Sequence, residues 1–191
     1  MNKKHNVSLS ALERLKDGNK KYIASKNCIG DVSLEKRLLT SKNGQHPFAV
    51  IISCSDSRVI PESIFSAGIG DLFVIRVAGN VIDNFQLGSI EYAVDHLGCK
   101  LVVVLGHTCC GAVSAALKQN SGYVKFITDE IKHAIGTESD MFKAVKLNVE
   151  QSVSKIKERL SGADLLVIGS IYHTESGVVD FFFSPHDDTT E

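Results

Sequence analysis

Residues 50–61 read Val-Ile-Ile-Ser-Cys-Ser-Asp-Ser-Arg-Val-Ile-Pro and join a buried strand to a group of reactive side chains. The apolar run at 48–52 has the length and β-branched composition of a strand buried on both faces. Such strands belong to parallel sheets, in which ligands bind beyond the carboxyl ends of the strands. We therefore expect a functional site at Cys54, Asp56 and Arg58.

A second stretch, at 101–111, is another apolar strand followed by Gly-His-Thr-Cys-Cys-Gly. The two strand ends would deliver Cys54, His107 and one further thiol to a single metal ion. That thiol is either Cys109 or Cys110, because the helix expected just after them favours the thiolate form of both. Three protein ligands leave a fourth position open, which is typical of a catalytic rather than a structural zinc site.

The same cysteines and histidine also have an ordinary interpretation, since buried free cysteines are common and a loop histidine is usually a polar residue with a partner. Their shared position just beyond apolar strands favours metal binding instead. Cys28 and Cys99 have no acid, base or histidine in their stretches, so we interpret them as structural.

Asp56 and Arg58 lie two residues apart, so their side chains can point the same way and meet as an ion pair. Such a pair usually only anchors a loop. Beside a metal ion, the carboxylate can instead occupy the fourth coordination position or hold a bound water, and the arginine competes for it. The spacing leaves these alternatives open.

The rest of the chain predicts one α/β domain over residues 1–191, with a central, mostly parallel sheet flanked by helices. Short apolar runs alternate with helical patterns. The strands are expected at 48–52, 72–77, 101–105 and 165–171, with an edge strand at 177–183. Helices are expected at about 8–25, 86–97, 110–118, 123–134 and 142–160. The polar segment 26–45 is expected to be irregular, and the acidic end from Asp187 to be frayed.

The helix at 8–25 carries apolar residues, including Leu9, Leu12 and Leu15, along one face. That face must pack on something. It lies either on its own domain or across a dimer on a second subunit, as an N-terminal arm.

Composition argues against several classes of partner. The formal net charge of −1 provides no basic surface for nucleic acid or an anionic membrane. No apolar run approaches the ~20 residues that span a bilayer. No secretory signal is visible, so we expect a cytoplasmic protein whose five cysteines stay reduced.

The motifs Cys-Ser-Asp-Ser-Arg-Val at 54–59 and Gly-His-Thr-Cys-Cys-Gly-Ala-Val at 106–113 resemble those of the β class of carbonic anhydrases. The resemblance extends to the turn at 76–80, to Glu-Tyr-Ala-Val at 91–94 and to 169–177. It implies a zinc enzyme that interconverts carbon dioxide and bicarbonate. Zinc lowers the pKa of bound water toward about 7, and the resulting hydroxide attacks carbon dioxide.

The resemblance also implies roles for particular residues. Cys54, His107 and Cys110 would bind a single zinc ion in each chain, which selects Cys110 over Cys109. Asp56 and Arg58 would form the catalytic pair of the family, with Asp56 holding the bound water in an attacking orientation.

Three more positions align with substrate-pocket residues of that family: Gln45, Phe73 and Tyr92. The two aromatic residues could equally be core residues. Because these pockets lie at a subunit interface in the family, the resemblance implies a homodimer or a homotetramer.

The chain departs from the family at a few positions. Some members close the site by letting the aspartate bind zinc, under the control of a bicarbonate site made of Trp, Arg and Tyr. Here Ile51 occupies the Trp position, although Arg76 and Tyr172 match the other two. We therefore predict an open site with water as the fourth ligand. Val77 and His173 replace the usual Asn and Asp.

Two rival functions remain. The same fold and zinc site can support hydrolysis of a carbon dioxide analogue such as carbon disulfide, and a non-catalytic module could use zinc only for folding. The pair Asp56–Arg58 favours an enzyme, since a binding module has no evident need for it. No proton-transfer residue is assigned; the candidates are His46, His96, His133 and His173.

Overall fold

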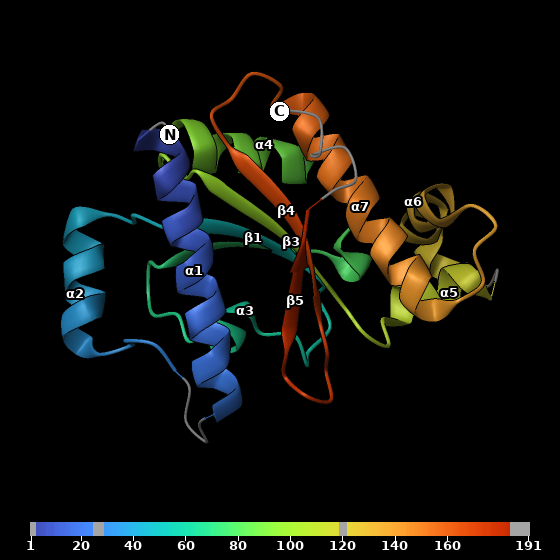
Figure 1. Ribbon diagram of the computed structural model, residues 1–191, viewed down its shortest axis with the longest axis horizontal. Helices are drawn as coiled ribbons and strands as arrows, with labels where there is room; N and C mark the ends of the chain where they lie inside the picture. Colours follow the sequence, from blue (N-terminus) through green and yellow to red (C-terminus); the bar gives the residue numbers. More distant parts are fainter. Residues whose placement is uncertain (1–2, 25–28, 119–121, 184–191) are drawn as a thin grey trace.

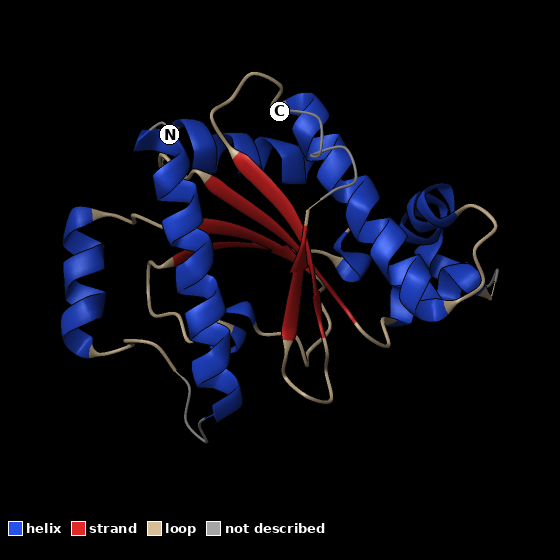
Figure 2. Ribbon diagram, in the orientation of Figure 1, coloured by secondary structure: helices blue, strands red, loops and turns tan. Residues whose placement is uncertain are grey.

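The computed structural model describes residues 3–24, 29–118 and 122–183, which form a five-stranded sheet flanked by helices (Figures 1 and 2). The strand order is β2-β1-β3-β4-β5. The strands are β1 (Ala49–Ser53), β2 (Leu72–Arg76), β3 (Leu101–His107), β4 (Leu166–Tyr172) and β5 (Val179–Phe182). The first four are parallel, and β5 pairs with β4 in the antiparallel sense. The predicted single α/β domain with an added edge strand is confirmed.

Seven α-helices connect and cover these strands within the described residues. They are α1 (Lys3–Ala24), α2 (Leu34–Asn43), α3 (Pro61–Ile64), α4 (Asn84–Asp95), α5 (Gly111–Leu117), α6 (Lys125–Ile135) and α7 (Met141–Arg159). Two 3₁₀ turns lie at Ala78–Asn80 and Gly122–Val124. Over the part of the chain that is described, none of the helices has the length and apolar character needed to cross a membrane.

The sheet is buried on both faces, as the apolar runs predict. Alternate residues of β1 enter different cores: Ile51 packs with α1 and α3, while Ile52 packs with α4 and α7. In Figure 1, α1 crosses in front of the strands, α4 passes behind the upper end of β4, and α7 runs along the right-hand side. Every residue of β1 and β3 is buried, so the strand ends are held rigidly.

A third core lies beyond the carboxyl ends of the strands. There α5, α6 and the first half of α7 pack together, at the right of Figure 1. The residues from the sheet and loops that join this core include Cys54, Val81 and Ile171. The site is therefore supported by helices as well as by strand ends.

The segment predicted to be irregular contains a helix, so that prediction is wrong. Ser33 caps α2 by accepting a hydrogen bond from the Lys36 backbone N–H at 3.1 Å, which satisfies one of the free amides of the first turn. No residue of α2 is buried, and Leu34, Leu38 and Leu39 are more than half exposed. Figure 1 shows α2 standing apart from the sheet.

The N-terminal helix packs on its own domain. It begins at Lys3, earlier than predicted, and buries Leu12 and Leu15 in the core beside β3. Gly18 allows close approach, because a Cβ there would lie 2.0 Å from the Phe65 carbonyl oxygen. Contact of this helix with a second subunit stays a prediction. The interpretation of Cys28 and the expected fraying from Asp187 fall outside the described residues.

Candidate metal centre

Three predicted ligands meet at the carboxyl edge of the sheet. Cys54 directly follows β1, His107 is the last residue of β3, and Cys110 precedes α5 as its cap. Because β1 and β3 are parallel neighbours, their ends lie side by side. The three ligand atoms all lie within 4.8 Å of one another, and all three residues are buried. The chain thus builds this group without help from another subunit.

His107 is oriented by its own loop. Its Nδ1 lies 2.9 Å from the Thr108 carbonyl oxygen, which can only accept, so the ring proton sits on Nδ1. The lone pair is then on Nε2, which is buried and has no hydrogen-bond partner among the described residues. A buried nitrogen left in this way costs free energy, and a metal ion at Nε2 would satisfy it.

The two thiols also suit a metal. Cys54 Sγ accepts hydrogen bonds from the backbone N–H groups of Asp56 at 3.4 Å and Gly79 at 3.2 Å. The Cys110 thiol beside it holds the pKa of Cys54 well below its usual range, while the neighbouring Cys54 and burial raise the pKa of Cys110. One thiolate is therefore already stabilised, and a divalent cation would stabilise the second. Two sulfurs and one imidazole nitrogen are donors typical of zinc.

Cys109 lies apart from this group. Cys109 is exposed, and its backbone is left-handed with φ of 58°, whereas Cys110 is buried. The structure therefore brings Cys110, rather than Cys109, to Cys54 and His107.

Asp56 and Arg58 form a bidentate pair beside the metal-binding group. Arg58 Nε donates to Asp56 Oδ1 at 2.9 Å, and Arg58 Nη2 donates to Oδ2 at 2.7 Å. These bonds hold the pKa of the Asp56 carboxyl well below its usual range, so it is ionised at neutral pH. Asp56 Oδ2 lies 4.0 Å from His107 Nε2. The carboxylate is thus near the metal position, but both its oxygens are held by arginine.

Arg76 supports the same loop in a way that sequence reasoning missed. Its guanidinium donates to the carbonyl oxygens of Cys54 at 3.2 Å and Asp56 at 2.8 Å. The available signal was the position of Arg76 at the end of β2, next to β1. Ile51 and Tyr172, which match the other two positions of the family's bicarbonate site, also make contacts within the fold. Ile51 is fully buried, and the Tyr172 hydroxyl lies 3.1 Å from that of Tyr22.

The predicted pocket residues are not brought to the metal-binding group within one chain. Gln45 is exposed and precedes β1, whereas Cys54 follows it, and the five residues of this strand span about 16 Å. Phe73 lies in β2 opposite Val50, and its ring is 6.2 Å from that of Tyr92 on α4. Gln45 and Phe73 therefore lie toward the amino ends of their strands, and Tyr92 of α4 lies beside Phe73.

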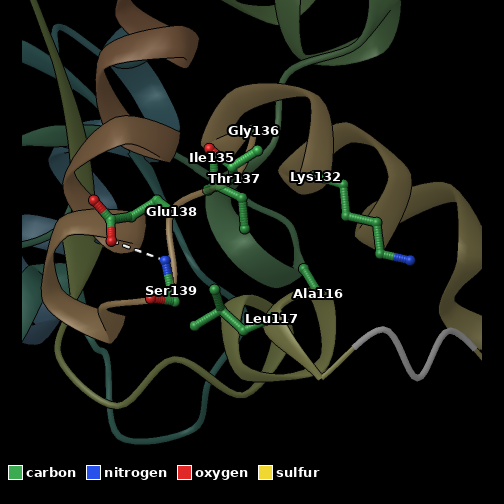
Figure 3. Close-up of a pocket in the computed structure, with 8 residues that line it drawn as sticks. All are labelled: Ala116, Leu117, Lys132, Ile135, Gly136, Thr137, Glu138 and Ser139. Atoms are coloured by element: carbon green, nitrogen blue, oxygen red, sulfur yellow. Dashed lines mark hydrogen bonds between the residues drawn. The ribbon is translucent and has the colours of Figure 1, made fainter.

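A separate cavity of about 490 Å³ lies at the far end of α5. Figure 3 shows that it is formed around the turn between α6 and α7, with Ala116 and Leu117 from α5. None of the three metal-binding residues lines it. It is therefore not the site.

Comparison with known proteins agrees with this geometry. The family model described as carbonic anhydrase matches residues 49–179, which include the whole metal-binding group. The chain belongs to the carbonic anhydrase family. Among the relatives of this carbonic anhydrase is carbonic anhydrase 2 of Mycobacterium tuberculosis, 37% identical over 187 residues, with 88% of this chain and 90% of the relative covered. The carbonic anhydrase of Mycolicibacterium smegmatis is also 37% identical, over 90% of this chain and 92% of its own.

Solved structures assign the class. The β-carbonic anhydrase CcaA matches with a TM-score of 0.68 and 30% identity, covering 94% of this chain and 98% of its own. A tetrameric β-carbonic anhydrase of Sordaria macrospora matches with a TM-score of 0.68 and 26% identity, over 78% and 87% of the two chains. This carbonic anhydrase is therefore of the β class, a class of zinc enzymes that interconvert carbon dioxide and bicarbonate.

Proposed function

We propose that Cys54, His107 and Cys110 are the zinc ligands of an enzyme that catalyses the reversible hydration of carbon dioxide to bicarbonate and a proton. The observation that carries this proposal is the unpartnered, buried Nε2 of His107 beside two thiols. Bound zinc acts as a Lewis acid that makes water acidic enough to supply hydroxide near neutral pH. The chain contributes the three metal-binding residues and the charged pair Asp56–Arg58 beside them.

Asp56 is the residue we assign to the orientation of water and substrate at the reacting end of the site. Its carboxylate is ionised and accepts hydrogen bonds, and Arg58 fixes its plane from the outer side. Arg58 Nη2 also donates to the Cys109 carbonyl at 3.3 Å, which ties the first loop to the second. This arrangement supports an open site, because the two hydrogen bonds from Arg58 compete with coordination of the Asp56 oxygens to a metal and still leave lone pairs that can accept from water.

A second copy of the chain is proposed to complete the substrate pocket with Gln45, Phe73 and Tyr92. The separation of Gln45 from Cys54 by the length of β1 supports this assignment. So do the exposed leucines of α2, which form an apolar surface that the described residues leave uncovered. A relative of known structure is described as tetrameric. We accordingly propose a homodimer or a homotetramer.

We also propose a cytoplasmic enzyme that acts on a small molecule rather than on nucleic acid or a membrane. The support is chemical: Cys54, Cys99, Cys109 and Cys110 are all free thiols, the state that a reducing compartment maintains. Cys99 is held in the core, where its thiol donates to the Pro47 carbonyl at 3.3 Å and burial raises its pKa to about 11. It is structural, as predicted.

The test is stopped-flow hydration of carbon dioxide, with zinc measured on the same sample and a zinc-stripped sample alongside. Activity that needs zinc supports the assignment. Full zinc occupancy without hydration from pH 6.5 to 9 would refute it. Turnover of carbon disulfide in that zinc-loaded sample would then identify a hydrolase of carbon dioxide analogues, and no turnover of either substrate would indicate a binding role.

A further inference from the structure

A buried amide on α7 lies behind the metal-binding group. Asn148 is 3% exposed, and its Nδ2 donates to the Gly79 carbonyl oxygen at 2.7 Å, across 69 residues of sequence. The backbone N–H of the same glycine donates to Cys54 Sγ at 3.2 Å. Gly79 therefore connects the amide of Asn148 to the first metal-binding thiol.

The turn that carries Gly79 is enclosed on several sides. Gly79 has a φ of +69°, which glycine adopts without strain. A Cβ at this position would lie 2.8 Å from Ile131 Cδ1 on α6 and 3.1 Å from Ala112 Cβ on α5. The helices thus limit how the turn can move, and the hydrogen bond from Asn148 determines where its peptide groups point.

One helical turn further along α7, Ser152 makes a parallel contact. Its Oγ donates to the Asn80 carbonyl oxygen at 3.2 Å and also lies 3.1 Å from the Asn148 carbonyl oxygen. Ser152 therefore holds the next carbonyl of the same turn, but not the residue whose N–H reaches the sulfur. This difference allows the two contacts to be separated by experiment.

We propose that Asn148 is a positioning residue for the zinc centre, which acts by holding the Gly79 N–H on the Cys54 sulfur. A hydrogen bond to a thiolate withdraws charge from it, so a metal ion bound there receives less charge from the sulfur. Without the amide, the buried Gly79 carbonyl loses its partner, and the turn can rotate its N–H away from Cys54 to recover one. This inference rests on the proposed zinc site, not on the reaction assigned to it.

The experiment compares cobalt-substituted wild-type enzyme with Asn148→Leu, which replaces the amide by an apolar group of the same branched shape, and with Ser152→Ala as the matched control. The expected result is a shift of the thiolate-to-cobalt charge-transfer band to lower energy in Asn148→Leu and an unchanged band in Ser152→Ala. Zinc affinity, measured by chelator competition, should fall roughly 10-fold in Asn148→Leu only.

If Asn148→Leu does not fold, as judged by circular dichroism, Asn148→Ala provides the same test without a larger apolar group. An unshifted band and unchanged zinc affinity in a folded Asn148 variant would overturn the inference, as would equal shifts in the Asn148 and Ser152 variants. A wild-type protein with no charge-transfer band at all would instead overturn the zinc site itself. The two failures are therefore distinguishable.

Discussion

The two edges of the sheet differ in how complete they are. At the carboxyl edge, Cys54, His107 and Cys110 converge within 4.8 Å inside a single chain. At the amino edge, Gln45 is exposed to solvent before β1 begins. Tyr92, which lies near Phe73, is 47% exposed.

This difference separates two kinds of site assembly. The metal-binding group follows from strand order and loop length, because neighbouring parallel strands must end together. The pocket residues lie on the outside of the fold, where only another molecule can turn them into a site. Metal binding is therefore a property of the chain, and we expect substrate binding to be a property of the assembly.

The largest effect should come from Cys54→Ser, which removes one of the metal-binding thiols at the carboxyl edge. Loss of a residue that only hydrogen-bonds to a metal ligand typically lowers metal affinity by up to ~100-fold. Loss of one of the two sulfur ligands should lower zinc affinity by more than that, and hydration activity should be lost with the metal. Zinc content after dialysis against a chelator, with stopped-flow rates on the same samples, measures both.

Cys109→Ser is the matched control for that change, since it replaces a neighbouring thiol that is exposed and outside the group. It should keep both zinc and activity. Equal zinc loss in the two variants would show that the metal does not sit where the three buried ligands meet.

The incomplete edge can be tested by mixing two inactive proteins. Asp56→Asn should impair the catalytic pair, and Gln45→Ala should impair the pocket, each leaving zinc in place. If Gln45 acts on the partner's metal centre, a mixed dimer contains one centre with both defects and one with neither. Random exchange of subunits should then restore about one site in four to full activity.

Exchange must be confirmed independently, for example by native mass spectrometry of subunits with different tags. Mixed dimers that stay as inactive as their parents would show that Gln45 and Asp56 both act on the metal centre of their own chain. The proposal that a second copy completes the pocket would then fail.

Much of the site was predictable from local sequence because Cys54 directly follows one buried strand and His107 ends another. Cys54 and His107 could be placed at one edge as soon as two parallel strands were recognised. Strand position alone left Cys109 and Cys110 open, and the resemblance to the β class selected Cys110; the physical reason lies in the loop conformation, in which Cys109 is left-handed and exposed. No pattern of residue types reports that conformation.

Other features depend on contacts that are distant in sequence. The helix α2 was missed because none of its residues is buried against the described part of the chain, so its polar composition resembles that of a loop. The supporting bonds of Arg76 and Asn148 run to backbone carbonyl oxygens, whose positions depend on the folded loops rather than on residue type. The metal ligands were thus predictable, whereas their supports were not.

A smaller effect should appear in the acid stability of the complete edge. Because Arg58 lowers the pKa of Asp56 from the usual 3.8, the pair stabilises the fold above that pH and loses its contribution as pH falls toward the lower, folded value. Asp56→Asn should cost about 1 kcal/mol at neutral pH, since the arginine is half exposed and screened by solvent.

Urea unfolding of both proteins, each free of metal, at pH 7 and pH 3 would measure this contribution. The difference between wild type and Asp56→Asn should be smaller at pH 3. A difference that is equal at the two values, or larger at pH 3, would contradict the assigned direction of the pKa shift.

The smallest effect should mark the outer boundary of the carboxyl edge, at His173. This residue directly follows β4, its Nε2 lies 2.8 Å from Asp180 Oδ2, and its ring stacks on Phe142. The two polar side chains are 30% and 66% exposed, and pairs of this kind contribute less than about 1 kcal/mol. His173→Ala should therefore change the free energy of unfolding by less than that and leave zinc affinity unaltered. A fall in zinc affinity comparable to that expected for Asn148→Leu would extend the metal centre outward to β4 and β5, and would show that the complete edge is larger than its three ligands and their immediate supports.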